Sequence, residues 1–198
     1  AADGIHSFAR AAFYPDEGPP TYSGRILWRA TTWAAPFLTG ASMIMAGHQD
    51  QKFVAYPIGA PRADGLQQIN WIAELRIAQS LRREDWNRRG ALEDFLPRFE
   101  DWRFDWLDVP GLIEGAEAVY EYPMVDRDPL TRWSHGRVTL LGDAAHPMYP
   151  IGSNGASQAI LDARALAQAF DARVESAGGR VEIEVAGVSA TADIVLAN

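Results

Sequence analysis

Apolar and polar residues alternate with a period of two along much of the first half of the chain. The clearest case is 66–76, where apolar residues of one parity alternate with mostly polar residues of the other: Ile69, Trp71, Ala73 and Leu75 against Gln68, Asn70, Ile72 and Glu74. This period predicts a β-strand with one buried and one wetter face. Segments 24–33, 43–46 and 52–58 are also predicted strands, and short turn-rich segments separate them. Consecutive strands joined by short turns predict an antiparallel sheet.

A helical pattern replaces this alternation in the second half of the chain. Segments 92–102 and 106–118 are predicted helices with a shared buried set of Phe95, Leu96, Phe99, Trp102, Trp106, Leu107, Leu112 and Ile113. Segment 118–124 is a predicted strand. A long helix is predicted from Gly155, because apolar residues recur there at helical spacing: Ala156, Ala159, Ile160, Ala163, Leu166, Ala167 and Phe170. Ser153 or Asn154 would serve as its N-cap.

These elements predict an α+β protein with two domains. Residues 21–135 form an antiparallel sheet with covering helices. Residues 1–20 and 136–198 form a second domain, made of a strand–loop–helix unit and a three-stranded β-meander over 173–198. The meander is predicted from the glycine turns near 178 and 187 and from the alternation between them.

Composition narrows the classes of function. The chain has 198 residues, 47% of them hydrophobic and 22% charged, which is typical of a globular protein. The net charge of −8 argues against a nucleic-acid or anionic-membrane partner. There is no cysteine and no apolar run long enough to span a bilayer, so a cytoplasmic location is expected. The four histidines lack metal-ligand spacing, and no metal site is predicted.

The strongest chemical signal lies between 136 and 170. A short apolar strand ends at Gly142, Asp143 follows, and a proline-punctuated loop leads into the long helix. The exposed amides at the start of such a helix can hold an anion. Spacing alone is equally consistent with an ordinary strand–loop–helix in which the aspartate fixes the loop. His146 beside Asp143 could belong to a catalytic triad, but a loop-fixing role fits it better.

The identities of the residues in this stretch say more about function than their spacing does. The strings GDAAH at 142–146 and GSNG at 152–155, with Pro150 between them and DA at 162–163, closely resemble the second flavin-binding motif of FAD-dependent aromatic hydroxylases, the para-hydroxybenzoate hydroxylase superfamily. The first ten residues resemble the Asp-Gly motif of the same family, with the usual Gly replaced by Ala1 and the pattern met by Ala2, Asp3, Gly4, Ser7 and Arg10.

This resemblance implies a monooxygenase that uses FAD and NAD(P)H to hydroxylate an aromatic small molecule. NAD(P)H would reduce the flavin, and oxygen would then add at flavin C4a to give the hydroperoxide that transfers an oxygen atom. The cofactor-binding residues that it implies are Asp3, Gly4, Arg10, Gly142, Asp143, Pro150, Gly152, Ser153, Asn154 and Gly155. The residues that it places beside the reacting ring are Met148, Tyr149 and Pro150.

The resemblance also implies a particular role for individual residues. Asp143 would accept hydrogen bonds from the ribityl hydroxyls, and Asp3 and Arg10 would act at the diphosphate and nicotinamide end. The string QINWIAE at 68–74 is similar to the phenazine-carboxylate hydroxylase branch. The sheet would roof the flavin, and only about half of the candidate substrate residues should face inward: Trp28, Arg29, Tyr56, Asn70 and Trp71.

Two departures from the family pattern leave alternatives open. The Gly-x-Gly-x-x-Gly segment that holds the FAD diphosphate is absent from the sequence. The 173–198 meander stands after the second flavin motif instead of before the Asp-Gly motif, which suggests a fragment or a circular permutation; an unrelated terminal hairpin is the other interpretation. The chain is therefore either part of an active hydroxylase or a catalytically silent substrate-binding or assembly domain. The oligomeric state, including a homo-oligomer, is left open.

Overall fold

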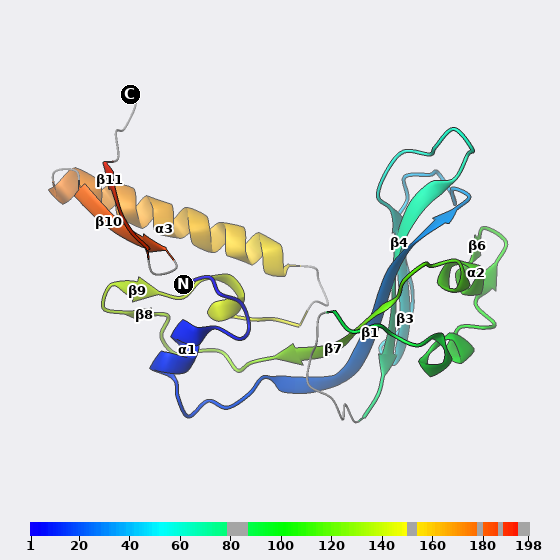
Figure 1. Ribbon diagram of the computed structural model, residues 1–198, viewed down its shortest axis with the longest axis horizontal. Helices are drawn as coiled ribbons and strands as arrows, with labels where there is room; N and C mark the ends of the chain where they lie inside the picture. Colours follow the sequence, from blue (N-terminus) through cyan, green and yellow to red (C-terminus); the bar gives the residue numbers. More distant parts are fainter. Residues whose placement is uncertain (79–86, 150–153, 178–179, 186–187, 194–198) are drawn as a thin grey trace. The chain divides into compact units, whose positions relative to one another are not determined.

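The computed structural model describes residues 1–78, 87–149, 154–177, 180–185 and 188–193, with side chains up to Phe170. The chain divides into two compact units (Figure 1). One unit comprises Ala1–Pro20 and Asp126–Asn198, and the other comprises Thr21–Val125.

The Thr21–Val125 unit is built on a five-stranded sheet with the order β2-β3-β4-β1-β7. Its strands are β1 (Thr21–Ala34), β2 (Ile44–His48), β3 (Gln51–Pro57), β4 (Gln67–Arg76) and β7 (Tyr120–Asp126). The pairs β1–β4, β3–β4 and β2–β3 are antiparallel. The predicted antiparallel sheet and the α+β class are confirmed.

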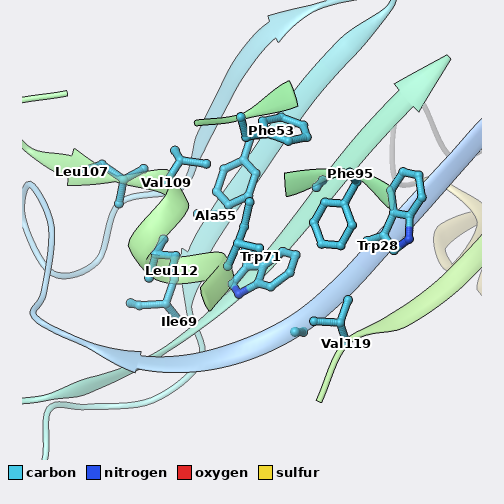
Figure 2. Close-up of a cluster of buried hydrophobic side chains, with 14 of the residues drawn as sticks. Trp28, Phe53, Ala55, Ile69, Trp71, Phe95, Leu107, Val109, Leu112 and Val119 are labelled. Carbon is cyan, nitrogen blue, oxygen red and sulfur yellow. The ribbon is translucent and has the colours of Figure 1, made fainter. Parts of the chain in front are cut away.

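One face of this sheet carries the hydrophobic core. The register places Trp28 opposite Ala73, and Ala73 opposite Phe53, so these three side chains share a face. Trp28 stacks on Phe95 with ring centroids 4.8 Å apart, and Phe53 stacks on Trp71 at 5.8 Å (Figure 2). Burial of such large aromatic groups is the main source of stability for a sheet of this size.

The segments that cover the core are much shorter than the helices predicted at 92–102 and 106–118. The structure has the 3-10 turns η1 (Leu92–Asp94) and η2 (Leu96–Arg98), the two-stranded ladder β5 (Arg103–Phe104) with β6 (Leu107–Asp108), and helix α2 (Val109–Glu114). Pro97 and Pro110 lie in the first turns of η2 and α2, where a missing N–H is tolerated, whereas an α-helix through Pro97 would lose a hydrogen bond. Of the predicted buried set, Trp106 is 40% exposed and Leu96 and Trp102 are half-buried against the core, whereas the other five residues are buried.

A buried hydroxyl links the sheet to α2. The Thr32 Oγ1 atom accepts a hydrogen bond from the Trp71 indole at 3.0 Å and donates to the Leu112 carbonyl at 2.6 Å. Each of these polar groups is therefore satisfied inside an apolar core.

The other unit contains α1 (Phe8–Phe13), the hairpin β8 (Ser134–His135) with β9 (Val138–Thr139), the 3-10 turn η3 (Gly142–Ala144) and the 23-residue helix α3 (Gly155–Ala177). Its described buried cluster is small and consists of Leu140, Ala144 and Ala145, with Ala9 and Leu130 against it. Residues 126–135 group with this unit, whereas the predicted boundary placed them with the sheet. The β8–β9 pairing and a hydrogen bond from Arg127 to the Ile5 carbonyl explain the grouping.

The end of the chain differs from the predicted three-stranded meander. Residues 173–177 continue α3, and the described strands are two, β10 (Arg180–Val185) and β11 (Val188–Asp193), paired antiparallel. The segment 173–177 contains Arg, Glu and Ala, which are good helix formers, so the helix runs on until the Gly178-Gly179 pair. The last residues of the predicted third strand, 194–196, lie outside the described residues.

Candidate functional site

The loop that begins at Gly142 is fixed against α3. Gly142 has a φ of 55°, in the left-handed region, and a Cβ added there would lie 3.3 Å from the Cβ of Ala159. Its amide donates a hydrogen bond to Oδ2 of Asp162 at 2.9 Å. Glycine therefore meets two needs at this position, the backbone conformation and the close approach to the helix.

The same carboxylate also holds the far end of the GDAAH string. The Nε2 atom of His146 lies 2.5 Å from Oδ2 of Asp162, and the ring of Trp133 packs against the imidazole with centroids 4.8 Å apart. These contacts support the loop-fixing role of His146 over a triad role. Asp162 itself was not among the predicted site residues. Its signal in the sequence is a carboxylate that stands inside an otherwise alanine-rich helix.

Asp143 stands out from its neighbours in η3. Gly142 and Ala144 are buried, but Asp143 is exposed, and its carboxylate has no hydrogen-bond partner among the described residues. A carboxylate in this state can accept hydrogen bonds from a ligand without breaking a protein contact. The loop around it is held at both ends by Asp162, so its backbone position is set before any ligand arrives.

The remaining predicted residues of this loop are only partly described. Met148 and Tyr149 are half-buried. Pro150, Gly152 and Ser153 lie outside the described residues, so their predicted roles stay predictions.

The described residues also locate the start of α3. Asn154 accepts, through its carbonyl, a hydrogen bond from the Gln158 amide at 2.9 Å, the first of the helical series. This places Asn154 at the N-cap position, immediately before Gly155.

The Asp-Gly motif forms a capped turn before α1. Asp3 accepts hydrogen bonds from the Ser7 hydroxyl at 2.6 Å and from the Phe8 amide at 2.8 Å, and Ser7 caps the helix through the Arg10 amide. Burial alone would raise the pKa of the Asp3 carboxyl, but the hydrogen bonds from Ser7 and from backbone amides outweigh it and hold the pKa below its ordinary value. Both carboxylate oxygens are thus engaged within the protein. Gly4 supplies the left-handed backbone of the turn, with a φ of 79°.

Arg10, whose predicted role lies at the diphosphate and nicotinamide end, is engaged within the protein in this structure. Its residue is 1% exposed, and its donors point at protein acceptors. Nη1 donates to the carbonyls of Ala144 at 3.2 Å and Ala145 at 2.9 Å, Nε and Nη2 donate to Glu17, and Nη2 also donates to the Asp128 carbonyl. An arginine has five N–H donors, so no donor remains for a cofactor. Arg10 instead ties the Asp-Gly motif to the GDAAH string.

The two motifs also meet along the main chain. The Leu141 amide donates to the Ala1 carbonyl at 2.9 Å, and the amino group of Ala1 donates to the Thr139 carbonyl. Residues about 140 positions apart in the sequence therefore form one local structure.

The five candidate substrate residues divide between the two faces of the sheet. Trp28 and Trp71 are 1% and 0% exposed and belong to the aromatic core, so they do not line a pocket (Figure 2). Asn70 lies opposite Thr31 on β1 and Tyr56 on β3, and Arg29 is two residues from Thr31. Because side chains two residues apart share a face, Arg29, Tyr56 and Asn70 lie together on the face opposite the core.

A pocket of about 480 Å³ opens on that face. Arg29 and Asn70 contribute to its wall, and the other lining residues are Ala30, Thr31, Trp33, Gln68, Gly115, Glu117, Ala118 and Tyr120. Arg29 is exposed, its guanidinium lies 6.0 Å from the centre of the Tyr122 ring, and none of the described carboxylates forms an ion pair with it. The Nδ2 atom of Asn70 is buried and has no hydrogen-bond partner among the described residues. The pocket thus combines aromatic walls with two unpaired donors.

The described part of the chain contains no group of three or more His, Asp or Glu side chains that could hold a metal ion. None of its helices is both long enough and apolar enough to cross a membrane.

Comparisons with known proteins identify the family of this chain. A family model described as "FAD binding domain" matches residues 1–181. The phenazine 1,6-dicarboxylic acid hydroxylase PhzS of Lysobacter antibioticus is 46% identical over 201 residues, which span all of this chain and 49% of that protein. The 6-hydroxynicotinate 3-monooxygenase of Bordetella bronchiseptica is 49% identical over 173 residues, which span 86% of this chain and 43% of that protein.

Solved structures show the same fold. The 2,6-dihydroxypyridine-3-hydroxylase of Arthrobacter nicotinovorans superposes with a TM-score of 0.65 at 24% identity, covering 85% of this chain and 47% of that one. A salicylate hydroxylase in complex with its substrate superposes with a TM-score of 0.59 at 25% identity, covering 80% of this chain and 42% of that one.

The chain spans about half the length of the curated relatives that it matches. The circular permutation suggested by the order of the segments stays a prediction.

Proposed function

This chain belongs to the FAD-binding domain family of flavin-dependent aromatic hydroxylases, and on that basis we propose that it is part of a monooxygenase that uses FAD and NAD(P)H to hydroxylate an aromatic small molecule. The observation that carries the proposal is the unpaired, exposed carboxylate of Asp143 in a loop whose two ends are both bonded to Asp162. Asp3 is engaged by hydrogen bonds in its own turn, so of these two aspartates the carboxylate of Asp143 is the one left free for a ligand.

The described residues fit the flavin and ribityl part of FAD. Asp143 would accept hydrogen bonds from ribityl hydroxyls, and the α3 amides that follow Asn154 would favour negative charge on the flavin ring. Gly142 and Ala144, on either side of the exposed Asp143, are buried. When bound, FAD supplies the redox and oxygen chemistry. Met148 and Tyr149 would border the substrate, and Pro150 would shape the adjoining backbone.

The substrate class follows from the pocket on the sheet. We propose an aromatic carboxylic acid, held by the guanidinium of Arg29 and the amide N–H of Asn70, with Tyr56 on the same face. A guanidinium without an ion-pair partner is suited to a carboxylate. The relatives include proteins named for phenazine 1,6-dicarboxylic acid, 6-hydroxynicotinate and 3-hydroxybenzoate, and each of these rings bears a carboxyl group.

The cofactor proposal can be tested with the purified chain, added FAD and desalting. Retention of the visible absorption bands of oxidised flavin supports the proposal. The variant Asp143→Asn should weaken FAD binding roughly tenfold, since it removes charged acceptors that a ligand would use. Asp105→Asn is the matched control, because Asp105 is an exposed carboxylate of the other unit. A chain that stays colourless with excess FAD would favour the catalytically silent domain instead.

A further inference from the structure

Glu17 lies outside every sequence motif of the site, yet it is the shared acceptor of two arginines. Arg10 donates to it from Nε at 2.8 Å and also from Nη2. Arg127 donates to its Oε2 atom from Nη1 at 3.0 Å. The Glu17 side chain is 19% exposed, and those of Arg10 and Arg127 are 1% and 11% exposed, so the three charges are largely removed from water.

The second contacts of both arginines reach distant segments of the same unit. Arg10 also donates hydrogen bonds to the carbonyls of Ala144 and Ala145 on the GDAAH string. Arg127 also donates hydrogen bonds to the carbonyls of Ile5 and Gly18, each at 2.9 Å. A guanidinium has a rigid planar fork, so fixing one edge on a carboxylate fixes the direction of the other edge.

We propose that Glu17 is a positioning residue for the cofactor loop: it orients Arg10, and through Arg10 it fixes the carbonyls of Ala144 and Ala145 and so the placement of Asp143. The link to FAD rests on the proposed function, but the link to the loop does not. The hydrogen bonds from Arg10 and the charge of Arg127 hold the pKa of Glu17 below its ordinary value against the opposing effect of burial, so the carboxylate is charged at neutral pH.

Without the carboxylate, Arg10 keeps its charge in a buried place and loses the partner that sets its direction. The carbonyls of Ala144 and Ala145 then lose their fixed donor. The backbone bonds of the loop that depend on this anchor are those from the Ala145 and His146 amides to the Gly142 carbonyl, at 2.9 and 2.8 Å. Asp162 would still hold Gly142 and His146, so the change should be confined to the loop and α1.

The test is hydrogen exchange on the purified full chain without FAD, which keeps it independent of cofactor binding. In Glu17→Gln, amides of 142–146 and α1 should exchange roughly tenfold to a hundredfold faster, while β1, β3 and β4 keep their wild-type rates. Glu17→Asp, which retains the charge, should recover part of the protection. Asp64→Asn is the matched control, since Asp64 pairs with Arg62 at the exposed surface.

Wild-type exchange in 142–146 of Glu17→Gln would overturn the proposal. So would equally accelerated exchange along α3 and β9, which would show a general structural role. If the wild-type chain binds FAD, Glu17→Gln should also raise the FAD dissociation constant and alter the flavin absorption bands. If the wild-type chain binds no FAD, the proposed function fails while the exchange result still decides the role of Glu17.

Discussion

The Oδ2 atom of Asp162 lies 2.5 Å from the Nε2 atom of His146 and 2.9 Å from the Gly142 amide. One oxygen atom on α3 thus joins the first and last residues of the GDAAH string. The string cannot shift along the helix without breaking one of these bonds.

Replacing Asp162 should therefore cost more than an average surface substitution. Asp162→Ala leaves the buried Gly142 amide without an acceptor, and we expect a loss of about 1–3 kcal/mol in the free energy of unfolding. Urea denaturation measures this loss. Asp105→Asn should leave the unfolding midpoint unchanged, and an unchanged midpoint in Asp162→Ala would contradict the role given to its carboxylate.

Gly142 offers a way to separate backbone strain from side-chain contact. Gly142 and Gly136 have φ values of 55° and 63°, but an added Cβ meets Ala159 only at Gly142. Each Gly→Ala variant should lose about 1–2 kcal/mol from the left-handed backbone, with a further loss at Gly142. In the Ala159→Gly background, which itself carries the helix cost of glycine of about 1 kcal/mol, Gly142→Ala should lose only the part due to the left-handed backbone. Equal destabilisation at the two glycines in thermal unfolding would argue against tight packing of the loop on α3.

The Asp3 cap predicts an acid-sensitive contribution to stability. Its pKa is below the ordinary value in the folded state, so its contribution is fully present above the unfolded pKa of about 3.9 and is lost as the pH falls through the lower, folded pKa. Asp3→Asn keeps an acceptor for the cap but cannot titrate. Between neutral pH and pH about 3, its unfolding midpoint should fall less than that of the wild type. Parallel curves would show that Asp3 titrates alike in the folded and unfolded states.

Arg29 should discriminate between charged and neutral ring substituents. In Arg29→Met, the dissociation constant for 6-hydroxynicotinate should rise roughly tenfold to a hundredfold, because a charge-assisted hydrogen bond is lost. Binding of the corresponding neutral amide should change little. Arg98→Met is the control, since Arg98 is exposed and does not line the pocket. Equal losses for acid and amide would indicate that Arg29 supports the pocket without recognising a carboxylate.

Local patterns predicted the sheet well, because the alternation of apolar and polar residues with a period of two can be seen within each strand. The alternation in 66–76 predicted β4, and the same parity explains why Trp71 is buried while Asn70 lines the pocket. The helices over the core were overestimated, because Pro97 lies inside the segment 92–102 and the chain forms short 3-10 turns there in place of an α-helix.

The contacts within the site were harder to predict, because they join distant segments. The motifs identified Asp3, Arg10 and Asp143. They did not predict that Arg10 would donate hydrogen bonds to the carbonyls of Ala144 and Ala145. Glu17 has no signal that distinguishes it from ordinary carboxylates in the sequence, and the motif contained Asp162 without indicating which groups it would bind. Their importance comes only from the groups that the fold brings to them.

The Thr21–Val125 unit enters on β1 and leaves on β7, which are neighbours in its sheet, and the Ser23 hydroxyl donates to the Met124 carbonyl at 2.9 Å. The first and last residues of this unit therefore lie side by side at one edge of the sheet. A unit with adjoining ends can be exchanged as a cassette without rethreading the rest of the chain. Transplanting 21–125 from a relative would then leave the Asp143 loop and its anchors as they are.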